Sequence, residues 1–176
     1  QAPDPEILKD IPDPFSDHIL LRRSLDEGNE GFEIKDLDGH TVYTVRLDED
    51  GTTRRVLDPD GNERLAVKIT SFAGSFSIEG MLPRRAEVSA STGHSATIRR
   101  RFSLGAPFVE VVEGQGRDAR RYSVREGGVY RNTRLIGRIY LLRDHIYLDV
   151  EEAALGTGLL GLLVSLCYEK TRTAAL

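Results

Sequence analysis

The sequence is poor in cysteine and in histidine, and it has fewer basic than acidic residues. Its 176 residues contain one cysteine, Cys167, which excludes an intrachain disulfide and a zinc site built from cysteines. The four histidines stand far apart without HxH or HxxxH spacing, so they indicate no metal site. Lys and Arg number 24 against 28 Asp and Glu, a formal net charge of −4. That balance excludes a globally basic nucleic-acid binder but allows a local basic patch.

Motifs for catalysis and nucleotide binding are also missing. No GxSxG elbow presents a serine nucleophile, and no glycine-rich phosphate loop opens a helix. Aromatic residues make up 7% of the chain, without the basic–aromatic pattern that stacks on nucleic-acid bases. We therefore expect no enzyme, and we predict no catalytic residue, cofactor, resident metal or nucleic-acid partner.

The first 16 residues, QAPDPEILKDIPDPFS, hold four of the seven prolines. Proline fixes its own φ and disfavours helix in the residue before it, so we predict an extended arm over residues 1–16. No basic stretch followed by an apolar run is seen, so the printed sequence predicts no signal peptide, and removal of one before Gln1 stays open. A single cysteine fits either redox compartment, so the compartment is undetermined.

Short alternating segments fill the chain from His18 to Val150. In ERLAVKIT, at 63–70, apolar residues alternate with charged or small ones, as in a half-buried strand. Asp-Gly pairs at 38–39, 50–51 and 60–61 recur about every ten residues and favour tight turns, which predicts an antiparallel meander. Their acidic neighbours resemble fragments of calcium loops, but the flanking helices of an EF-hand are missing. Further strands are predicted near residues 20–25, 31–35, 41–47, 52–57, 74–81, 86–92, 95–104, 108–114, 119–126, 133–142 and 145–150.

One segment is apolar on every side, and we predict a helix over residues 152–169. A helix without a polar face is either buried on all sides or placed in a membrane. Its apolar part is shorter than the roughly 20 residues that span a bilayer, so we favour burial and expect no transmembrane span. Gly156, Gly158 and Gly161 weaken an isolated helix by about 1 kcal/mol each. They suit a helix whose backbone is pressed closely by strand side chains.

These elements predict a mainly β fold, a closed antiparallel barrel of about twelve strands around a hydrophobic C-terminal helix. Closure removes the exposed edges of the sheet, and the helix fills the apolar interior. The barrel domain is predicted over residues 17–170, followed by a tail at 171–176.

Three segments, FEIKDLDGHTVYTV, RRVLDPDGNERLAVK and GLLGLLVSLCYEK, resemble the LURP-one-related family. That family belongs to the Tubby C-terminal-like superfamily, alongside the phospholipid scramblases. The resemblance covers roughly residues 18–170 and implies a twelve-stranded barrel around a central helix, without a catalytic activity. The acidic Ca²⁺-binding segment of the scramblases and the lipid-binding Lys and Arg residues of Tubby domains have no clear counterpart here. The matching positions are Phe32, Ile34, Asp36, Gly39, Val42, Arg54, Arg55, Asp58, Gly61 and Leu65.

Arginine clusters are the most informative polar feature. Doublets stand at 22–23, 54–55, 84–85 and 120–121, and a triplet stands at 99–101. Neighbours in a strand face opposite sides, so one arginine of a doublet can lean inward along its aliphatic stem. The outward arginines either pair with acids on a solvated face or converge into a phosphate-binding patch, to which the planar guanidinium is suited. The candidate lipid- or anion-binding residues are Arg84, Arg85, Arg99 and Arg101.

We therefore expect a non-catalytic binding module. It engages phosphoinositides or other anionic lipid head groups through a basic barrel face. The localisation is left open, and a soluble, cytoplasmic protein peripheral to membranes is one that fits this expectation. The alternative is a protein-interaction or structural module without lipid binding. A barrel that holds a small ligand is disfavoured, because the central helix occupies its interior.

Overall fold

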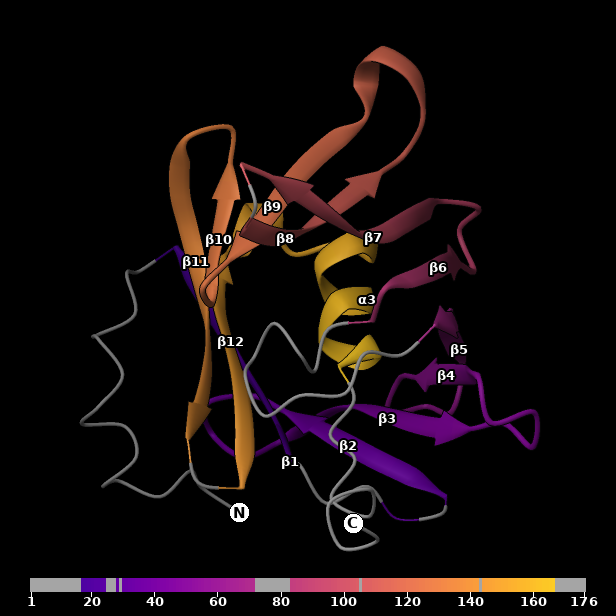
Figure 1. The fold of residues 1–176 in the computed structure, drawn as a ribbon. Helices are drawn as coiled ribbons and strands as arrows, with labels where there is room; N and C mark the ends of the chain where they lie inside the picture. The colour runs from indigo at the N-terminus through magenta and orange to yellow at the C-terminus, as the bar shows by residue number, and fades with distance from the viewer. Residues whose placement is uncertain are drawn as a thin grey trace, which may run out of the picture.

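Twelve strands form one closed antiparallel barrel around an α-helix in the computed structural model, which describes residues 17–24, 28, 30–71, 83–104, 106–142 and 144–166 (Figure 1). Each strand pairs with its neighbours in the chain, and β1 pairs with β12 to close the barrel. The predicted fold class is therefore confirmed. The strands are β1 (His18–Ser24), β2 (Gly31–Lys35), β3 (Thr41–Leu47), β4 (Thr53–Leu57), β5 (Glu63–Ser71), β6 (Arg85–Ala90), β7 (Ser95–Ser103), β8 (Ala106–Glu113), β9 (Arg120–Arg125), β10 (Gly128–Arg131), β11 (Arg134–Leu142) and β12 (His145–Glu151). A short 3₁₀ turn, η1 (Gly116–Asp118), lies between β8 and β9.

The strand list differs from the prediction in one place. Strand β10 has four residues and is absent from the predicted set. It stands between two tight turns in which Glu126 and Asn132 adopt φ of 48° and 57°, so the run is too short to show an alternation. The strand predicted at 74–81 lies outside the described residues, as do the arm at 1–16 and the tail at 171–176.

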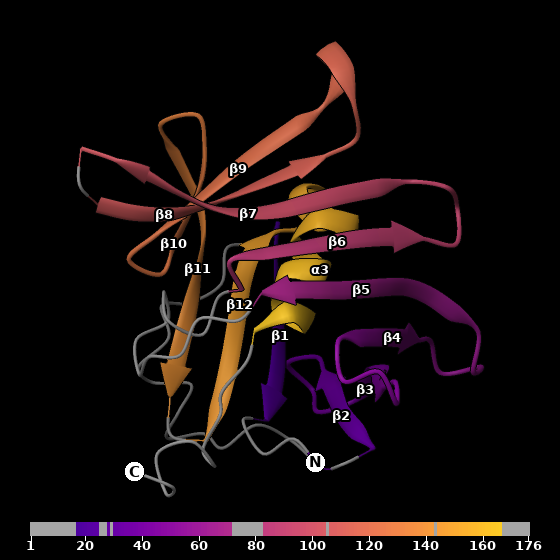
Figure 2. The same ribbon diagram turned by 45° about the vertical axis from the view of Figure 1, so that its right-hand side comes forward.

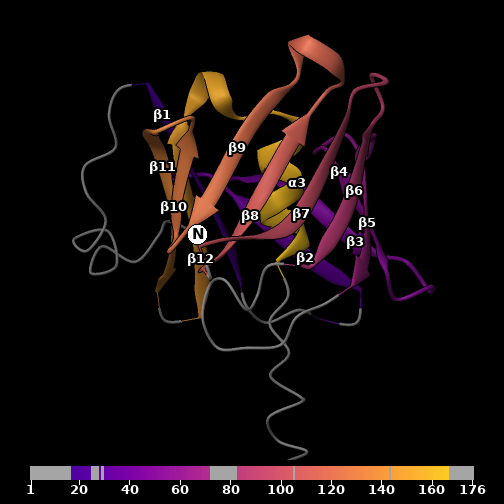
Figure 3. The same ribbon diagram turned by 45° about the horizontal axis from the view of Figure 1, so that its top comes forward.

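The helix α3 (Thr157–Ser165) lies inside the ring of strands (Figure 3). It begins later than the predicted start at residue 152, because Glu152–Ala154 form a 3₁₀ turn, η2, and Gly156 is extended. Every residue from Gly158 to Ser165 is buried, which confirms the prediction of a helix covered on all sides. It also ends earlier than the predicted residue 169, because α3 stops at Ser165 and Leu166 is extended; residues 167–169 lie outside the described residues. In the described part of the chain, no helix combines the length and the apolar character needed to cross a membrane.

Two glycines let the strands approach the backbone of α3. A Cβ atom on Gly161 would lie 2.5 Å from Val88 Cγ2 on β6, and one on Gly158 would lie 2.8 Å from Val111 Cγ1 on β8. Both distances are too short for a carbon–carbon contact. The close approach expected at these glycines is therefore confirmed, and α3 packs against β6 and β8 without room for a methyl group.

Three hairpin turns repeat one backbone pattern, at residues 36–40, 58–62 and 90–94. In the second, Asp58 N donates to Asn62 O and Gly61 N donates to Asp58 O, each at 2.9 Å. Gly61 has φ of 83°, a conformation that favours glycine. The Asp58 carboxylate accepts bonds from Asp60 N, Asn62 N and Arg64 Nε at 2.9–3.0 Å. In this turn, therefore, the aspartate at the first position binds the turn backbone, and the glycine three residues later supplies the positive φ.

Candidate functional site

Two buried arginines close the C-terminal end of α3. Arg23 on β1 donates from Nη1 to the carbonyl oxygens of Leu163 at 2.9 Å and Leu166 at 2.8 Å. Arg54 on β4 donates from Nη1 to Val164 O at 2.8 Å. The last carbonyls of a helix have no partners within it and carry partial negative charge, so cations are favoured there.

Phe32 on β2 holds these two guanidinium groups in place. The guanidinium carbon of Arg23 lies 3.8 Å from the centre of the Phe32 ring, and that of Arg54 lies 5.6 Å from it. The face of an aromatic ring attracts a cation, which offsets part of the cost of burying the charge. The predicted inward lean of one arginine in a doublet is thus observed for Arg23 and Arg54, and both serve the fold.

A second group of basic side chains gathers on the outer surface of β5 to β9, and we call it the basic face. Every member except Arg101 stands next to a buried core residue in its strand, and Arg101 lies two residues beyond Arg99 on the same side of β7, so all six point to solvent. The six members and the two acids among them, Glu87 and Glu110, give a formal charge of +4 on a chain of −4. Arg64, on the same side of β5, is not counted because it pairs with Asp58 of the turn at 58–62. The members are Lys68, Arg85, Arg99, Arg101, Arg121 and Arg125.

The strand register arranges the basic face in rows. Arg85 stands directly opposite Arg99, and Arg99 directly opposite Glu110. Like charges placed opposite each other destabilise a sheet pair. The same pairing of arginines occurs at Arg46 and Arg55 and at Arg131 and Arg134, so the charge of the whole basic face, rather than this one pair, distinguishes it. In the next row Arg101 stands opposite Phe108.

The two acids neutralise only part of the basic face. Glu110 Oε1 accepts a bond from Arg101 Nε at 3.1 Å and lies 3.8 Å from Arg121 Nη1. Arg85 Nη2 lies 3.3 Å from Glu87 Oε1. These side chains are exposed or half-buried, so each ion pair is screened and can exchange for another anion.

The structure brings together three of the four predicted site residues. Arg85, Arg99 and Arg101 share the basic face, whereas Arg84 does not. Arg84 lies with Arg100 and Phe102 around a cavity of about 360 Å³. Arg100 and Phe102 belong to the side of β7 that Ile98 presents to the core, because side chains alternate along a strand.

The sequence analysis missed Lys68, Arg121 and Arg125 as neighbours of the predicted cluster. The available signal was the meander itself, because consecutive hairpins place β5, β6, β7, β8 and β9 side by side. Alternation then puts every second residue of these strands on one surface.

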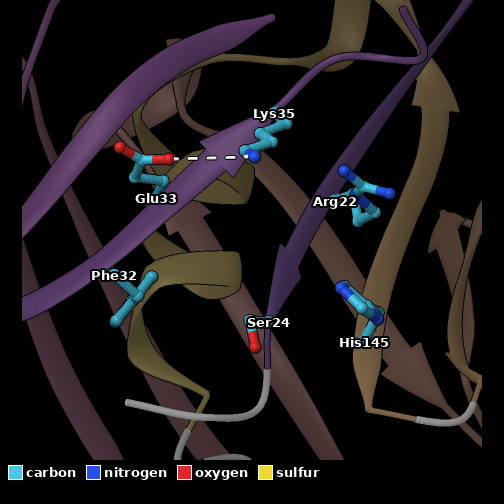
Figure 4. Close-up of a pocket in the computed structure, with 6 residues that line it drawn as sticks. All are labelled: Arg22, Ser24, Phe32, Glu33, Lys35 and His145. Carbon is cyan, nitrogen blue, oxygen red and sulfur yellow. Dashed lines mark ion pairs between the residues drawn. The ribbon is translucent and has the colours of Figure 1, made fainter. Parts of the chain in front are cut away.

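A smaller cavity of about 180 Å³ opens beside β1, β2 and β12, lined by Arg22, Ser24, Phe32, Glu33, Lys35 and His145 (Figure 4). Lys35 Nζ lies 3.9 Å from Glu33 Oε2, so one acid faces the basic groups. Arg22 and His145 lie close together on neighbouring strands in Figure 4. The cavity therefore carries mixed charge and less excess positive charge than the basic face.

Oxygen and nitrogen atoms of Asp36, Asp38 and His40 lie within 4.8 Å of one another on an exposed turn. His40 N donates to Asp36 Oδ1 at 2.9 Å, a contact that closes the turn. Exposed acidic groups of this kind are common without an ion. We therefore assign no metal to them.

Comparisons with known proteins identify no family. No family model matches the sequence, and no curated protein matches it. A solved structure of a protein from Arabidopsis thaliana, AT5G01750, is similar with a TM-score of 0.48 and 12% identity, over 83% of this chain and 89% of that chain. At these values the similarity carries no argument about family or function.

Proposed function

We propose that the protein is a non-catalytic binding module whose basic face engages phosphoinositides or other anionic lipid head groups. One observation carries the proposal. Six basic side chains and two acidic ones share a single surface, although the whole chain is acidic. Membership of the LURP-one-related and Tubby-like group, with a scramblase-like fold, is part of the same proposal and rests on the sequence resemblance.

The chemistry of the basic face suits phosphate. A guanidinium group donates two parallel N–H bonds to phosphate oxygens. A phosphate between Arg85 and Arg99 would remove the repulsion between two like charges that the register places opposite each other. Each Lys or Arg near an anionic bilayer contributes on the order of 1 kcal/mol.

The interior of the barrel is filled by α3, which leaves the outer surface for binding. Residues of α3 such as Leu159, Leu162 and Val164 are fully buried against inward side chains of the strands. A ligand inside the barrel would have to displace the helix. The binding surface is therefore proposed on the outside, where the charge is concentrated.

An acidic protein surface is the alternative occupant of the basic face, which would make the protein an interaction module without lipid binding. Electrostatic complementarity can guide such an association as well. The two candidates differ in one respect, because only the first requires affinity for lipid vesicles in the absence of other proteins.

The test is co-sedimentation of the unmodified protein with three kinds of vesicle: phosphatidylcholine alone, phosphatidylcholine with phosphatidylserine, and phosphatidylcholine with a phosphoinositide. We expect binding to both anionic kinds and loss of binding as salt rises from about 0.05 M to about 0.5 M, because salt screens these contacts. Failure to sediment with either anionic vesicle at low salt would overturn the lipid proposal. The interaction module would then be the better explanation of the basic face.

A further inference from the structure

The β7–β8 hairpin ends in two large apolar side chains that face solvent. Phe102 is 73% exposed and Leu104 is fully exposed. Among the described residues, the other exposed large apolar side chains are Leu37 and Leu135, at 37% and 40%, and they stand singly on other elements. Figure 2 shows the end of β7 and the start of β8 reaching outward from the barrel at the left.

The backbone at the hairpin tip does not explain the choice of leucine. Leu104 has φ of 52°, in the left-handed region that costs a residue with a Cβ atom about 1 kcal/mol. The turns at 36–40 and 58–62 place Gly39 and Gly61 at their positive φ values. A large apolar residue here departs from the preference for glycine at positive φ. Such departures are common where a side chain serves binding.

Basic side chains surround the apolar tip. Arg84 and Arg100 lie with Phe102 around the cavity of about 360 Å³ on one side of the hairpin. On the other side Arg101 belongs to the basic face, and the guanidinium carbon of Arg125 lies 4.1 Å from the centre of the Phe108 ring. Glu110 stands opposite Arg99, two residues before Arg101 on β7, so among these described residues the arginines outnumber the acids around the tip.

We propose that the β7–β8 hairpin inserts Phe102 and Leu104 into the acyl-chain boundary of an anionic bilayer, while the surrounding arginines contact the head groups. This inference rests on the proposed function and adds the edge of the barrel that enters the membrane. A protein partner suits the tip less well, since a stable protein interface buries about 800 Å² on each side, far more than two side chains on one projecting hairpin. An apolar tip within a basic surround matches the layered chemistry of a bilayer surface.

A tryptophan placed at the tip tests insertion directly, because the sequence contains no tryptophan of its own. The Leu104→Trp variant is mixed with vesicles of phosphatidylcholine, phosphatidylserine and a phosphoinositide, with and without bromine on the acyl chains. We expect a blue-shifted emission that brominated lipid quenches. The matched Leu37→Trp variant carries its tryptophan on the turn at 36–40 and is expected to show neither change.

Two failures of this experiment are distinguishable. If the Leu104→Trp variant sediments with the vesicles but is not quenched, the hairpin does not insert, and head-group binding by the basic face stands. If the parent protein fails to sediment as well, the insertion and the proposed function are both wrong.

Removal of the apolar side chains gives an independent measurement. The Phe102→Ser/Leu104→Ser variant is expected to bind the same vesicles about tenfold to a hundredfold more weakly than the parent. Its melting temperature should not fall, because both side chains face solvent. The matched Leu37→Ser/Leu135→Ser variant should bind as the parent does. Equal affinity of the tip variant and the parent would overturn the proposal.

Discussion

Arg54 and Arg55 are neighbours on β4, yet they occupy opposite sides of the barrel wall. Arg54 is 7% exposed and donates to the last carbonyls of α3, whereas Arg55 is half-exposed and pairs with Asp48 at 2.9 Å and Glu63 at 2.8 Å. The two side chains have the same chemistry. The alternation of the strand alone decides that one stabilises the helix end and the other meets solvent.

The same division separates two regions of the barrel. On β1 and β4, Arg23 and Arg54 turn inward to the end of α3. On β6 to β8 the inward positions nearest the helix hold small or branched apolar residues such as Ala86, Val88 and Val111, and arginines of the basic face turn outward. We infer that the inner arginines serve stability, and we propose binding only for the outer arginines of the basic face.

The largest expected effect comes from a charge inside the barrel. Leu162 on α3 is fully buried, so Leu162→Asp should abolish folding. A lone buried carboxylate costs several kcal/mol, against a total stability of about 5–15 kcal/mol. Circular dichroism and urea unfolding are the measurements, with the exposed Leu37→Asp as control. A cooperative transition retained by Leu162→Asp would contradict the enclosed helix.

Substitutions of Arg54 and Arg55 on β4 should give the next largest difference in the free energy of unfolding. Arg54→Gln removes bonds to buried carbonyls and should lower the free energy of unfolding by about 2–3 kcal/mol. Arg55→Gln removes exposed ion pairs and should change it little. Urea titrations of the two variants make the comparison. Equal losses would show that the helix end does not depend on the inward arginine.

The close approach of α3 to β6 predicts a smaller loss of stability for a substitution at Gly161, and a second substitution at Val88 should compensate for it. Gly161→Ala should cost about 1–3 kcal/mol, because its methyl group would overlap the Val88 side chain. In a Val88→Ala background the same change should cost much less. A double-mutant cycle measures this coupling, and additive effects would argue against contact between the two residues.

The turn at 58–62 predicts a pH dependence. The backbone N–H of Asn62, followed by Arg64, holds the pKa of the Asp58 carboxyl below its usual 3.8. A lowered folded pKa means that the carboxylate contributes stability above about pH 4, and that this contribution is lost as the pH falls through the folded pKa. Asp58→Asn should therefore melt below the parent at pH 7, with the gap closing in acid. A gap of constant size from pH 7 to pH 2 would exclude this role.

The sequence predicted the fold through two local signals, alternation in the strands and glycine at the turns. It missed β10, whose four residues are too few for a pattern, and it began the helix too early because Glu151 and Glu152 look like a helix start. It also left open which arginine of a doublet points inward. On β1 both Leu20 and Leu21 are buried, so the apolar pattern there does not identify the core side.

The candidate site was predicted in part, for a reason that lies in the strand register. Arg85 and Arg99 stand in strands joined by a short hairpin, so their proximity follows from local structure. Arg84 precedes β6 and lies with Arg100 and Phe102 instead, because neighbouring residues of an extended chain face opposite sides. Arg121 and Arg125 join the face through pairings across two strands, which depend on a register that a single sequence does not show.

The most direct test of the division between inner and outer arginines is the affinity of the Arg85→Gln/Arg99→Gln/Arg101→Gln variant for phosphoinositide vesicles. The control carries the same change of charge at three other exposed arginines, as Arg46→Gln/Arg131→Gln/Arg138→Gln. We predict a loss on the order of 100-fold for the basic-face variant, with an unchanged melting temperature and a far smaller loss in the control. Equal affinities of the two variants would contradict the account.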